Sequence, residues 1–493
     1  MEKTLNRSTL RNGLYNIVGQ VARGAVVVLA IPFLIRFLGI AEYGVWSFAY
    51  AFLALLTMCE GGFSVAAVVF LSKDLANNNR RGAGHTLAFV IISAALLSAA
   101  LASLLWFAGP LLARPLSTFG NAERATAGRA LQIAGFGAAI LIFQRTLVGI
   151  EQAFNRYALI NGLDLLQALL TNLGFLLVVS CGGKSVALMK WQILASVFLL
   201  AAHACFVTRL CRQHQLHLAW NERKGRQIFR YTVTTWIATL GTAAFGQCDR
   251  LVVGWTLGPS SLGIYSAITN ITSKINTLSA TAVQPVIPSL SRDVELGIPS
   301  EGRIRQIMYL NALIAIGGGI FLYVLADWIV RTLGLSGTAQ QYIHGFRIAT
   351  IIYALYSLNA PGFYILFSLG GVRTNAVITL ASGLLSLLLI IAGARYFGVI
   401  GALAGNAGYL ASLLLVVRSL GKTGIALGQY LKWMLLPAIC LATALIAGPI
   451  MQGHLLWQTG FVMVEIILFT VWFFHHPGTV KPINLALGRT SEG

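Results

Sequence analysis

The sequence predicts an all-α integral membrane protein with about 14 transmembrane helices: two pseudo-symmetric six-helix lobes around a central cavity, plus two C-terminal helices. Three observations predict this fold, namely the apolar composition, the length of the apolar segments and an internal repeat. Of the 493 residues, 57% are hydrophobic and only 10% are charged, whereas a soluble domain carries roughly 25% charged residues. Most of the surface must therefore face an apolar medium.

The apolar segments have the length that membrane-spanning helices need. Each is close to the roughly 20 residues with which an α-helix crosses a bilayer. Backbone N–H and C=O groups find no water in hydrocarbon, so each segment should be helical. The predicted spans are 13–35, 44–71, 85–108, 129–149, 157–180, 187–208, 230–254, 263–288, 305–327, 343–367, 376–394, 398–417, 430–450 and 455–475.

The distribution of Lys and Arg predicts how these helices are oriented. With the N-terminus in the cytoplasm, 22 of the 35 Lys and Arg residues fall in cytoplasmic segments, nine on the opposite side and four within spans. This asymmetry obeys the positive-inside rule and places both termini in the cytoplasm. The net charge of +20 is then mostly topological, and no soluble basic module remains to bind nucleic acid. The basic loop 209–230 is either an orientation signal or a contact for anionic lipid headgroups.

A repeated phrase divides the chain. FLGIAEYGVWS (37–47) and TLGPSSLGIYS (256–266) share Leu-Gly, four residues, Gly, an aliphatic, an aromatic and Ser at an offset of 219 residues. At the same offset, LSKD (71–74) matches LSRD (290–293). The two phrases bracket the second and eighth predicted helices. The alternative is that Leu-Gly and Gly-Tyr are simply common at helix ends.

An even number of spans separates these equivalent helices, so both halves should have the same orientation in the membrane, as in a parallel repeat. We therefore expect an N-lobe over 1–215, a C-lobe over 216–425, and two extra helices with a cytoplasmic tail over 426–493. The Gly residues of the repeat should shape a turn, and its aromatic, Trp46 or Tyr265, could anchor at the membrane interface.

Several kinds of site are not expected. The six cysteines form no CxxC pair, so neither a disulfide framework nor a metal site is predicted. His203 has no carboxylate or Cys partner at ligand spacing. No GxxxxGK[ST] phosphate loop and no nucleophile–base arrangement occur. We expect no cofactor, and we do not expect an enzyme.

Polar side chains form stripes on the first and eighth predicted helices. Ionisable groups inside a span are costly and usually face a wet cavity or a partner. Arg23 could supply a fixed positive charge whose donors match a phosphate, or it could pair with a carboxylate. The stripes consist of Asn12, Asn16, Gln20 and Arg23 on one helix and of Asn270, Lys274, Thr277, Thr281 and Gln284 on the other.

Further ionisable residues lie in the second, fourth, fifth and seventh spans. Arg145 and Asp164 could face the cavity or form an ion pair within the first lobe. Glu60, in the middle of the second span, is a candidate proton site or a partner for Arg23. Asp249 lies near the end of the seventh span.

Three stretches carry a family resemblance: NIVGQVARGAVVVLAIPFLIRFLGIAEYGVWSFA (16–49), CEGGFSVAAVVFLSKDLA (59–76) and QCDRLVVGWTLGPSSLGIYS (247–266). The chain resembles the polysaccharide transporter family of bacterial inner membranes, within the multidrug/oligosaccharidyl-lipid/polysaccharide exporter superfamily. The resemblance implies a V-shaped fold and alternating access. It implies that an undecaprenyl-pyrophosphate-linked oligosaccharide is flipped from the cytoplasmic to the periplasmic leaflet for O-antigen, capsule or exopolysaccharide synthesis. It places Glu60 where Asp is commoner and matches Asp249 to the family's acidic position.

The side chains fit such a cargo. A pyrophosphate needs positive groups, and the sugars need hydrogen-bonding partners. We expect membrane lipids, a polysaccharide polymerase and a chain-length regulator as partners. A lipid II flippase and an ion-coupled multidrug antiporter are the alternatives, although a cavity for cationic drugs should favour carboxylates. The predicted cavity residues are Arg23, Asn16, Gln20, Lys274, Asn270, Gln284, Arg145 and Arg250, and the predicted coupling or gating residues are Glu60, Asp249 and Asp164.

Overall fold

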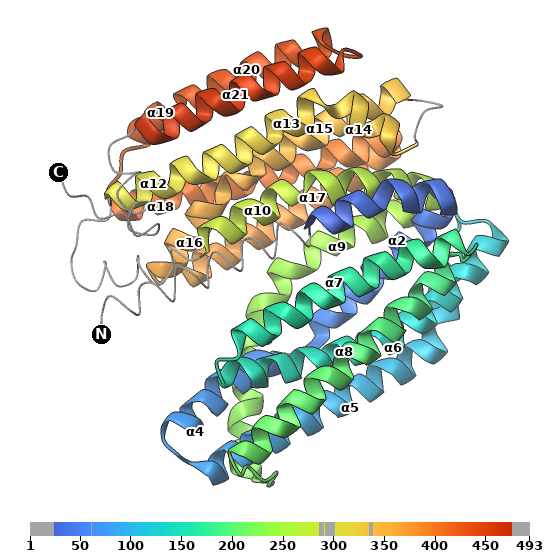
Figure 1. Ribbon diagram of the computed structural model, residues 1–493, viewed down its shortest axis with the longest axis vertical. Helices are drawn as coiled ribbons and strands as arrows, with labels where there is room; N and C mark the ends of the chain where they lie inside the picture. The colour runs from blue at the N-terminus through green and yellow to red at the C-terminus, as the bar shows by residue number, and fades with distance from the viewer. Residues whose placement is uncertain (1–23, 61, 285–289, 291–300, 335–338, 476–493) are drawn as a thin grey trace. The chain divides into compact units, whose positions relative to one another are not determined.

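The structure, a computed structural model, describes residues 24–60, 62–284, 290, 301–334 and 339–475 (Figure 1). Every regular element in these ranges is a helix. Ten of the described helices are long and apolar enough to cross a membrane, or eleven if the bent pair Leu427–Trp433 and Leu435–Ile450 counts as one span. The prediction of an all-α, multi-pass membrane protein is confirmed, whereas the number of 14 stays a prediction.

The chain forms two compact units, one of residues 29–266 and one of the described residues of 267–475 together with 24–28. The first unit contains α2 (Ile40–Thr57), η1 (Met58–Glu60), α3 (Phe63–Ala66), η2 (Ala67–Leu71), α4 (Ser72–Ala76), α5 (Arg80–Ala113), α6 (Asn121–Ala153), α7 (Tyr157–Ser180), α8 (Ser185–Gln213) and most of α9 (Glu222–Thr272). The division after Ser266 lies further along the chain than the predicted lobe boundary at 215/216.

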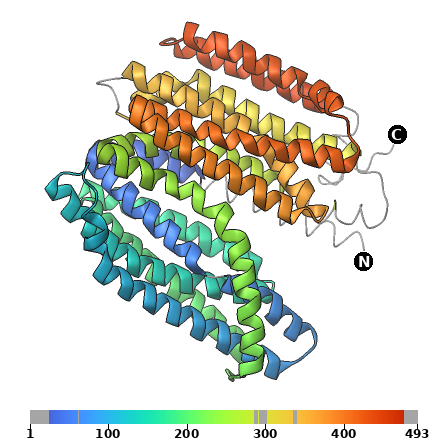
Figure 2. The same ribbon diagram turned by 180° about the vertical axis from the view of Figure 1, so that it is seen from behind.

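The second unit, drawn from yellow-green to red over residues 267–475 in Figure 2, continues from the end of α9. Its elements are α10 (Lys274–Val283), α12 (Glu301–Ala312), η3 (Leu313–Gly317), α13 (Gly318–Val324), α14 (Ala326–Thr332), α15 (Ala339–Ser357), α16 (Asn359–Ser368), α17 (Val372–Gly405), η5 (Asn406–Leu413), α18 (Leu414–Thr423), α19 (Leu427–Trp433), α20 (Leu435–Ile450) and α21 (Leu455–His475).

Helix α6 is the central helix of the first unit and packs against α2, α5 and α8. Its buried face is rich in small residues, among them Gly128, Gly135 and Gly137. Hydrophobic burial from water does not drive helices together in lipid, so small residues that allow close backbone approach favour association. The α5–α6 pair, side by side in Figure 1, is packed in this way, since a Cβ on Gly135 would meet Leu105 of α5.

Two long helices turn back on themselves at a glycine, so that two pairs of predicted spans are each counted as one. Gly258 in α9 has a φ of 82° and Gly398 in α17 has a φ of 59°, in the region that favours glycine. Tyr265 reaches Asp249 across the first turn, and a Cβ on Gly401 would overlap the Gly393 backbone across the second. Each helix therefore has two antiparallel arms.

The repeated phrase occupies equivalent turns, and its two copies pack against each other. Gly39 has a φ of 80°, close to the 82° of Gly258, 219 residues later. A Cβ on Gly44 would overlap the Pro259 carbonyl oxygen. A Cβ on Gly263 would overlap the carbonyl oxygen of Ile40.

Ile40 is equivalent to Pro259, and Gly44 is equivalent to Gly263, since each pair is separated by the repeat offset of 219 residues. The glycine of each copy therefore contacts the equivalent backbone position of the other copy. This reciprocity indicates a local two-fold relationship inside the first unit. The expected turn-forming role of the repeat's glycines is thus observed. The expectation that Trp46 or Tyr265 anchors at the membrane interface is wrong, because both are buried, at 8% and 0% exposed.

In the second unit, two charged side chains fasten the α20–α21 hairpin. Arg347 of α15 donates from Nη2 to the Gly448 carbonyl (2.9 Å) and from Nη1 to Gln452 Oε1 (3.1 Å). Asp327 of α14 accepts from Gln458 Nε2 (2.6 Å) and from the Gly453 N–H (2.8 Å). Both ionic groups are thus satisfied without an ion pair between them, and the two C-terminal helices dock firmly on this unit.

We predict that Gly44→Ala destabilises the protein by about 1–3 kcal/mol, because the added methyl group overlaps backbone that cannot rotate away. The measurement is thermal unfolding of the purified protein in detergent. Gly162→Ala on α7 is the matched control, since nothing lies within 4 Å of its Cβ position. Equal unfolding temperatures for the two variants would contradict the close crossing.

Candidate functional site

Two arginines from different helices of the first unit lie within electrostatic range of one tyrosine. Tyr50 of α2 is 36% exposed. Arg145 lies within α6 and is exposed, and Arg250 lies within α9 and is half-buried. Both guanidinium groups interact electrostatically with the Tyr50 phenol. Two fixed positive charges within membrane-spanning segments form a site suited to an anion, because guanidinium donors match phosphate oxygens.

Arg145 is the more available of the two charges. Within the described residues, no ion pair joins it to Asp164, the partner that was considered for it. Its neighbour Gln144 is buried and donates to Gln167 Oε1 of α7 (2.8 Å). Asp164, also on α7, is half-buried. The exposed charge of Arg145 is therefore not used to hold α6 against α7.

Arg250 is positioned by the residue before it. Asp249 is buried and accepts a hydrogen bond from the Tyr265 hydroxyl (2.9 Å) and one from the Arg250 N–H (2.7 Å). Arg250 Nη1 in turn donates to Gln247 Oε1 (3.3 Å). The carboxylate thus fixes the two arms of α9 relative to each other. Its predicted role in coupling or gating stays a prediction.

An aromatic row supports Tyr50. The ring centroids of Tyr43 and Trp46 are 5.4 Å apart, and those of Trp46 and Tyr50 are 5.3 Å apart. Trp46 also packs edge-on against Phe175 of α7 at 5.4 Å. The row follows one face of α2 at spacings of three and four residues. Tyr50 is its exposed end, and this residue was missed in the sequence, although its spacing from Tyr43 and Trp46 is a readable signal.

Glu60 lies where the second span is interrupted. The helical path breaks between η1 and α3, and Gly62 adopts a φ of 76°. Glu60 Oε1 accepts from the Ser64 N–H (2.6 Å), so the carboxylate satisfies a donor at the start of the next helical turn. Trp236 of α9 donates to the Met58 carbonyl (2.8 Å) beside the break. Glu60 therefore has a capping role here, and its predicted coupling role stays a prediction.

Of the two predicted polar stripes, only the one on the eighth predicted helix lies within the described residues. Asn16, Gln20 and Arg23 lie outside the described residues. In the second unit, Asn270 and Lys274 are half-buried and Gln284 is exposed. These three are thus not core residues, and their assignment to the cavity stays a prediction.

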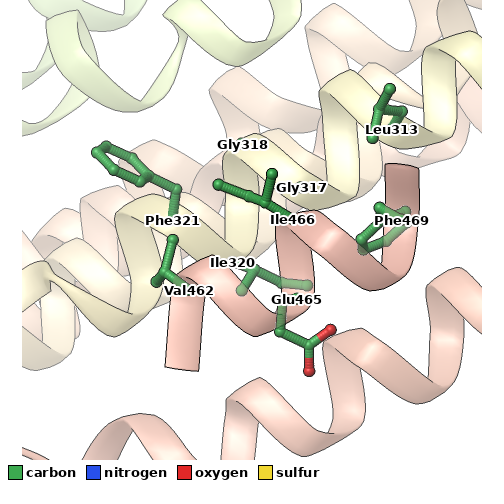
Figure 3. A pocket seen from close by; sticks show the side chains of 9 residues that line it. All are labelled: Leu313, Gly317, Gly318, Ile320, Phe321, Val462, Glu465, Ile466 and Phe469. Carbon is green, nitrogen blue, oxygen red and sulfur yellow. The ribbon is translucent and has the colours of Figure 1, made fainter. Parts of the chain in front are cut away.

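The second unit contains an apolar pocket of about 260 Å³ between the η3–α13 segment and α21 (Figure 3). Eight of its nine lining residues are apolar or glycine, so its walls suit a hydrocarbon chain. The ninth, Glu465, directs its carboxylate toward α20, where Thr443 donates to Oε1 (3.0 Å). The π-helix Leu313–Gly317 forms one side; such segments are frequent at functional sites.

A basic pocket of about 440 Å³ lies where α5 connects to α6, with Arg114, Arg124 and Arg129 in its lining. Arg124 Nε donates to the carbonyls of Leu116 (2.8 Å) and Phe119 (2.9 Å), which orders the connection. Arg114 and Arg129 are exposed. The pocket carries positive charge that could attract an anion. Its α6 residues lie near the start of that helix, before Arg145 in the sequence.

His203 has a carboxylate partner that the spacing of residues in the sequence does not indicate. His203 Nδ1 lies 3.0 Å from both carboxylate oxygens of Glu151, and both side chains are fully buried. The pair was not visible in the sequence because its members are 52 residues apart on different helices.

Comparison with known proteins agrees with this architecture. A family model described as "Polysaccharide biosynthesis protein" matches residues 9–293, more than half of the chain. No curated protein matches the sequence.

Solved structures share the fold at low sequence identity. One is the lipid II flippase MurJ in an inward closed conformation (TM-score 0.72, 14% identity, covering 94% of this chain and 98% of that one). Another is an inward-facing multidrug resistance MATE transporter of the MOP superfamily (0.69, 12%, 82% and 98%). A third is a MOP superfamily transporter from Pyrococcus furiosus (0.61, 13%, 85% and 96%).

We predict that Tyr265→Phe destabilises the protein by about 1–3 kcal/mol, because the buried Asp249 carboxylate loses its hydroxyl donor. Tyr396→Phe is the control, since Tyr396 is 80% exposed. Thermal unfolding in detergent measures both changes, and an unaffected Tyr265→Phe protein would show that the hydrogen bond does not fix the two arms.

Proposed function

Because the chain belongs to the polysaccharide biosynthesis protein family, we propose that it is a flippase for an undecaprenyl-pyrophosphate-linked oligosaccharide. It moves this repeat unit from the cytoplasmic to the periplasmic leaflet by alternating access, for O-antigen, capsule or exopolysaccharide synthesis. The solved structures with this fold are transporters and a flippase rather than enzymes, in agreement with the prediction that the chain is not an enzyme.

The location of Arg145, which is exposed, and Arg250, which is half-buried, within spans of the first unit is the observation that carries the proposal. A pyrophosphate presents several anionic oxygens, and two guanidinium groups on separate helices can contact it from two sides. Within the membrane such charges are costly unless they serve a ligand or a partner. Arg145, exposed and without an ion-pair partner among the described residues, is available to a ligand.

The remaining assignments follow from this cargo. Arg23 and Lys274 add positive charge, and Asn16, Gln20, Asn270 and Gln284 hydrogen-bond the sugars. The protein lies in the bacterial inner membrane with both termini in the cytoplasm, and its lobes comprise 1–215 and 216–425. Its partners are membrane lipids, a polysaccharide polymerase and a chain-length regulator.

A lipid II flippase is the second candidate, favoured by the shared fold over 94% of this chain. Its pyrophosphate would use the same arginines, so the two candidates differ in the sugar and not in the anion. A cation-exporting antiporter is disfavoured by the positive charge around Tyr50.

We predict that Arg145→Ala lowers the translocation rate about 10- to 100-fold, the equivalent of one lost charge-assisted contact. Arg145→Lys should retain part of the activity because it keeps the charge but not the planar fork. Arg156→Ala is the control, an exposed arginine just beyond the same helix. The measurement is movement of lipid-linked oligosaccharide across proteoliposome membranes at matched protein content.

Cells lacking the protein should accumulate lipid-linked oligosaccharide in the cytoplasmic leaflet, and Arg23→Ala should abolish export while protein abundance is unchanged. Normal translocation by Arg145→Ala would refute the site. Accumulation of lipid II instead of the oligosaccharide would identify the second candidate.

A further inference from the structure

A buried pair of ionisable side chains lies outside the proposed cargo site. Glu151 is in the last turn of α6, and His203 is in α8, one turn before the apolar residue Val207. Both side chains are 0% exposed, and His203 Nδ1 lies 3.0 Å from each carboxylate oxygen. Within the described residues, each is the other's only polar side-chain partner. The pair forms an isolated acid–base unit.

The surroundings of this Glu151–His203 pair are hydrocarbon. Ile150, Ala153 and Val207, its neighbours along α6 and α8, belong to a buried apolar cluster of the first unit. A net charge in such surroundings is costly, whereas a pair without net charge is tolerated. With a neutral imidazole and an ionised carboxylate the pair carries one negative charge. One added proton removes that charge, whether the proton resides on the carboxyl group or on the ring.

The neighbouring charges do not compensate the pair. The Glu60 carboxylate accepts a hydrogen bond from the Ser64 N–H, and Asp74 forms an ion pair with Lys224 at 2.6 Å. Both carboxylates therefore have other partners. On α6 and α8 themselves, Arg145 and Arg209 are exposed. Other titratable groups on these two helices and on the elements packed against them include Glu42 and Tyr50 of α2, His85 of α5, Asp164 of α7 and Cys211 of α8. None of them makes a hydrogen bond or ion pair with Glu151 or His203.

The second ring nitrogen of His203, Nε2, is buried and lacks a hydrogen-bond partner within the described part of the chain. Either protonation state of this nitrogen leaves an unmet donor or acceptor, so the present packing does not lock the ring into one state. Because the pair is fully buried, exchange of its proton with water requires α6 and α8 to open locally.

The segment that packs against α6 next to the pair has irregular helical geometry. Gly149, two residues before Glu151, allows α6 to lie directly on Ser64, whose Cα would be 2.6 Å from a Cβ at that position. Ser64 is in the short helix α3, between the break at Glu60 and the π-helix Ala67–Leu71. Such π-helices are frequent at functional sites, and this one lies in the span that packs against α6 beside the pair.

We propose that Glu151 and His203 form a proton-binding site whose loading and release accompany the conformational cycle of the protein. A proton from water on one side adds to the pair and leaves to water on the other side, with no other bond made or broken. The coupling to transport rests on the proposed function, whereas proton binding by the pair does not. Coupling free energies are reciprocal. If a conformational change alters the affinity of the pair for a proton, binding of the proton must shift the conformational equilibrium by the same free energy.

Proton binding is tested directly by ¹⁵N NMR of histidine-labelled full-length protein in lipid nanodiscs. The His203 signals are identified by their absence in His203→Gln. The His203 ring signals should show uptake of a proton when the folded protein is acidified, and Glu151→Gln should change this response. A ring that takes up no proton, or a response unaffected by Glu151→Gln, would overturn the proposal.

Coupling is tested in proteoliposomes with the undecaprenyl-pyrophosphate-linked oligosaccharide as probe. For one proton per cycle, each unit of pH difference should bias the distribution of the probe between leaflets by about tenfold. The double variant Glu151→Gln/His203→Gln keeps the shapes and a hydrogen bond and should remove this bias, with folding checked by its thermal unfolding.

Asp74→Asn is the matched control, because it breaks another largely buried pair of the first unit. Retained bias in the double variant, or equal loss in Asp74→Asn, would overturn the coupling. A wild-type protein that moves no probe under any gradient would refute the proposed cargo, while the NMR titration would still decide whether the pair binds a proton.

Discussion

The crossing of the two copies of the repeat is the constraint on which the first unit depends. At Gly44 and Gly263, backbone lies against backbone with no room for a Cβ atom. The turns at Gly39 and Gly258, both with positive φ, bring the chain to this crossing. The position of α2 against the second arm of α9 is therefore set by main-chain atoms. Such a contact tolerates little drift, because the groups that would collide are not flexible side chains.

This constraint reaches the site through one hydrogen bond. The aromatic of the second copy, Tyr265, donates to Asp249 on the first arm of α9, and Asp249 holds the Arg250 backbone. The aromatic of the first copy, Trp46, stacks against the Tyr50 ring. Both copies of the repeat thus position cationic or aromatic groups of the same site. The duplicated phrase therefore has a structural consequence at the proposed site, although none of its residues needs to contact a ligand there.

The sequence allowed the helices, their apolar faces and the turn glycines to be predicted, because composition and helical periodicity are local properties. Periodicity shows which residues share a face, but not which helix meets that face. For this reason the Glu151–His203 pair was missed, and the Arg145–Asp164 pair was considered although the structure does not contain it. Trp46 was expected at the interface because an aromatic beside a turn usually lies there, yet tertiary packing buried it.

Among the described residues, the charged side chains fall into two groups, those whose hydrogen-bonding groups have partners and those whose groups do not. Asp327 and Arg347 have full sets of partners and hold helices together, whereas Arg145 remains exposed and the Glu151–His203 pair lacks one partner. The anionic cargo proposed above would be driven out of the cytoplasm by about 2.3 kcal/mol per elementary charge for each 100 mV of inside-negative potential. The same potential drives a proton inward. Exchange of the proposed cargo for a proton would therefore let one membrane potential drive both movements. Arginines that stay fixed while the anion passes would lower its barrier without using up this driving force.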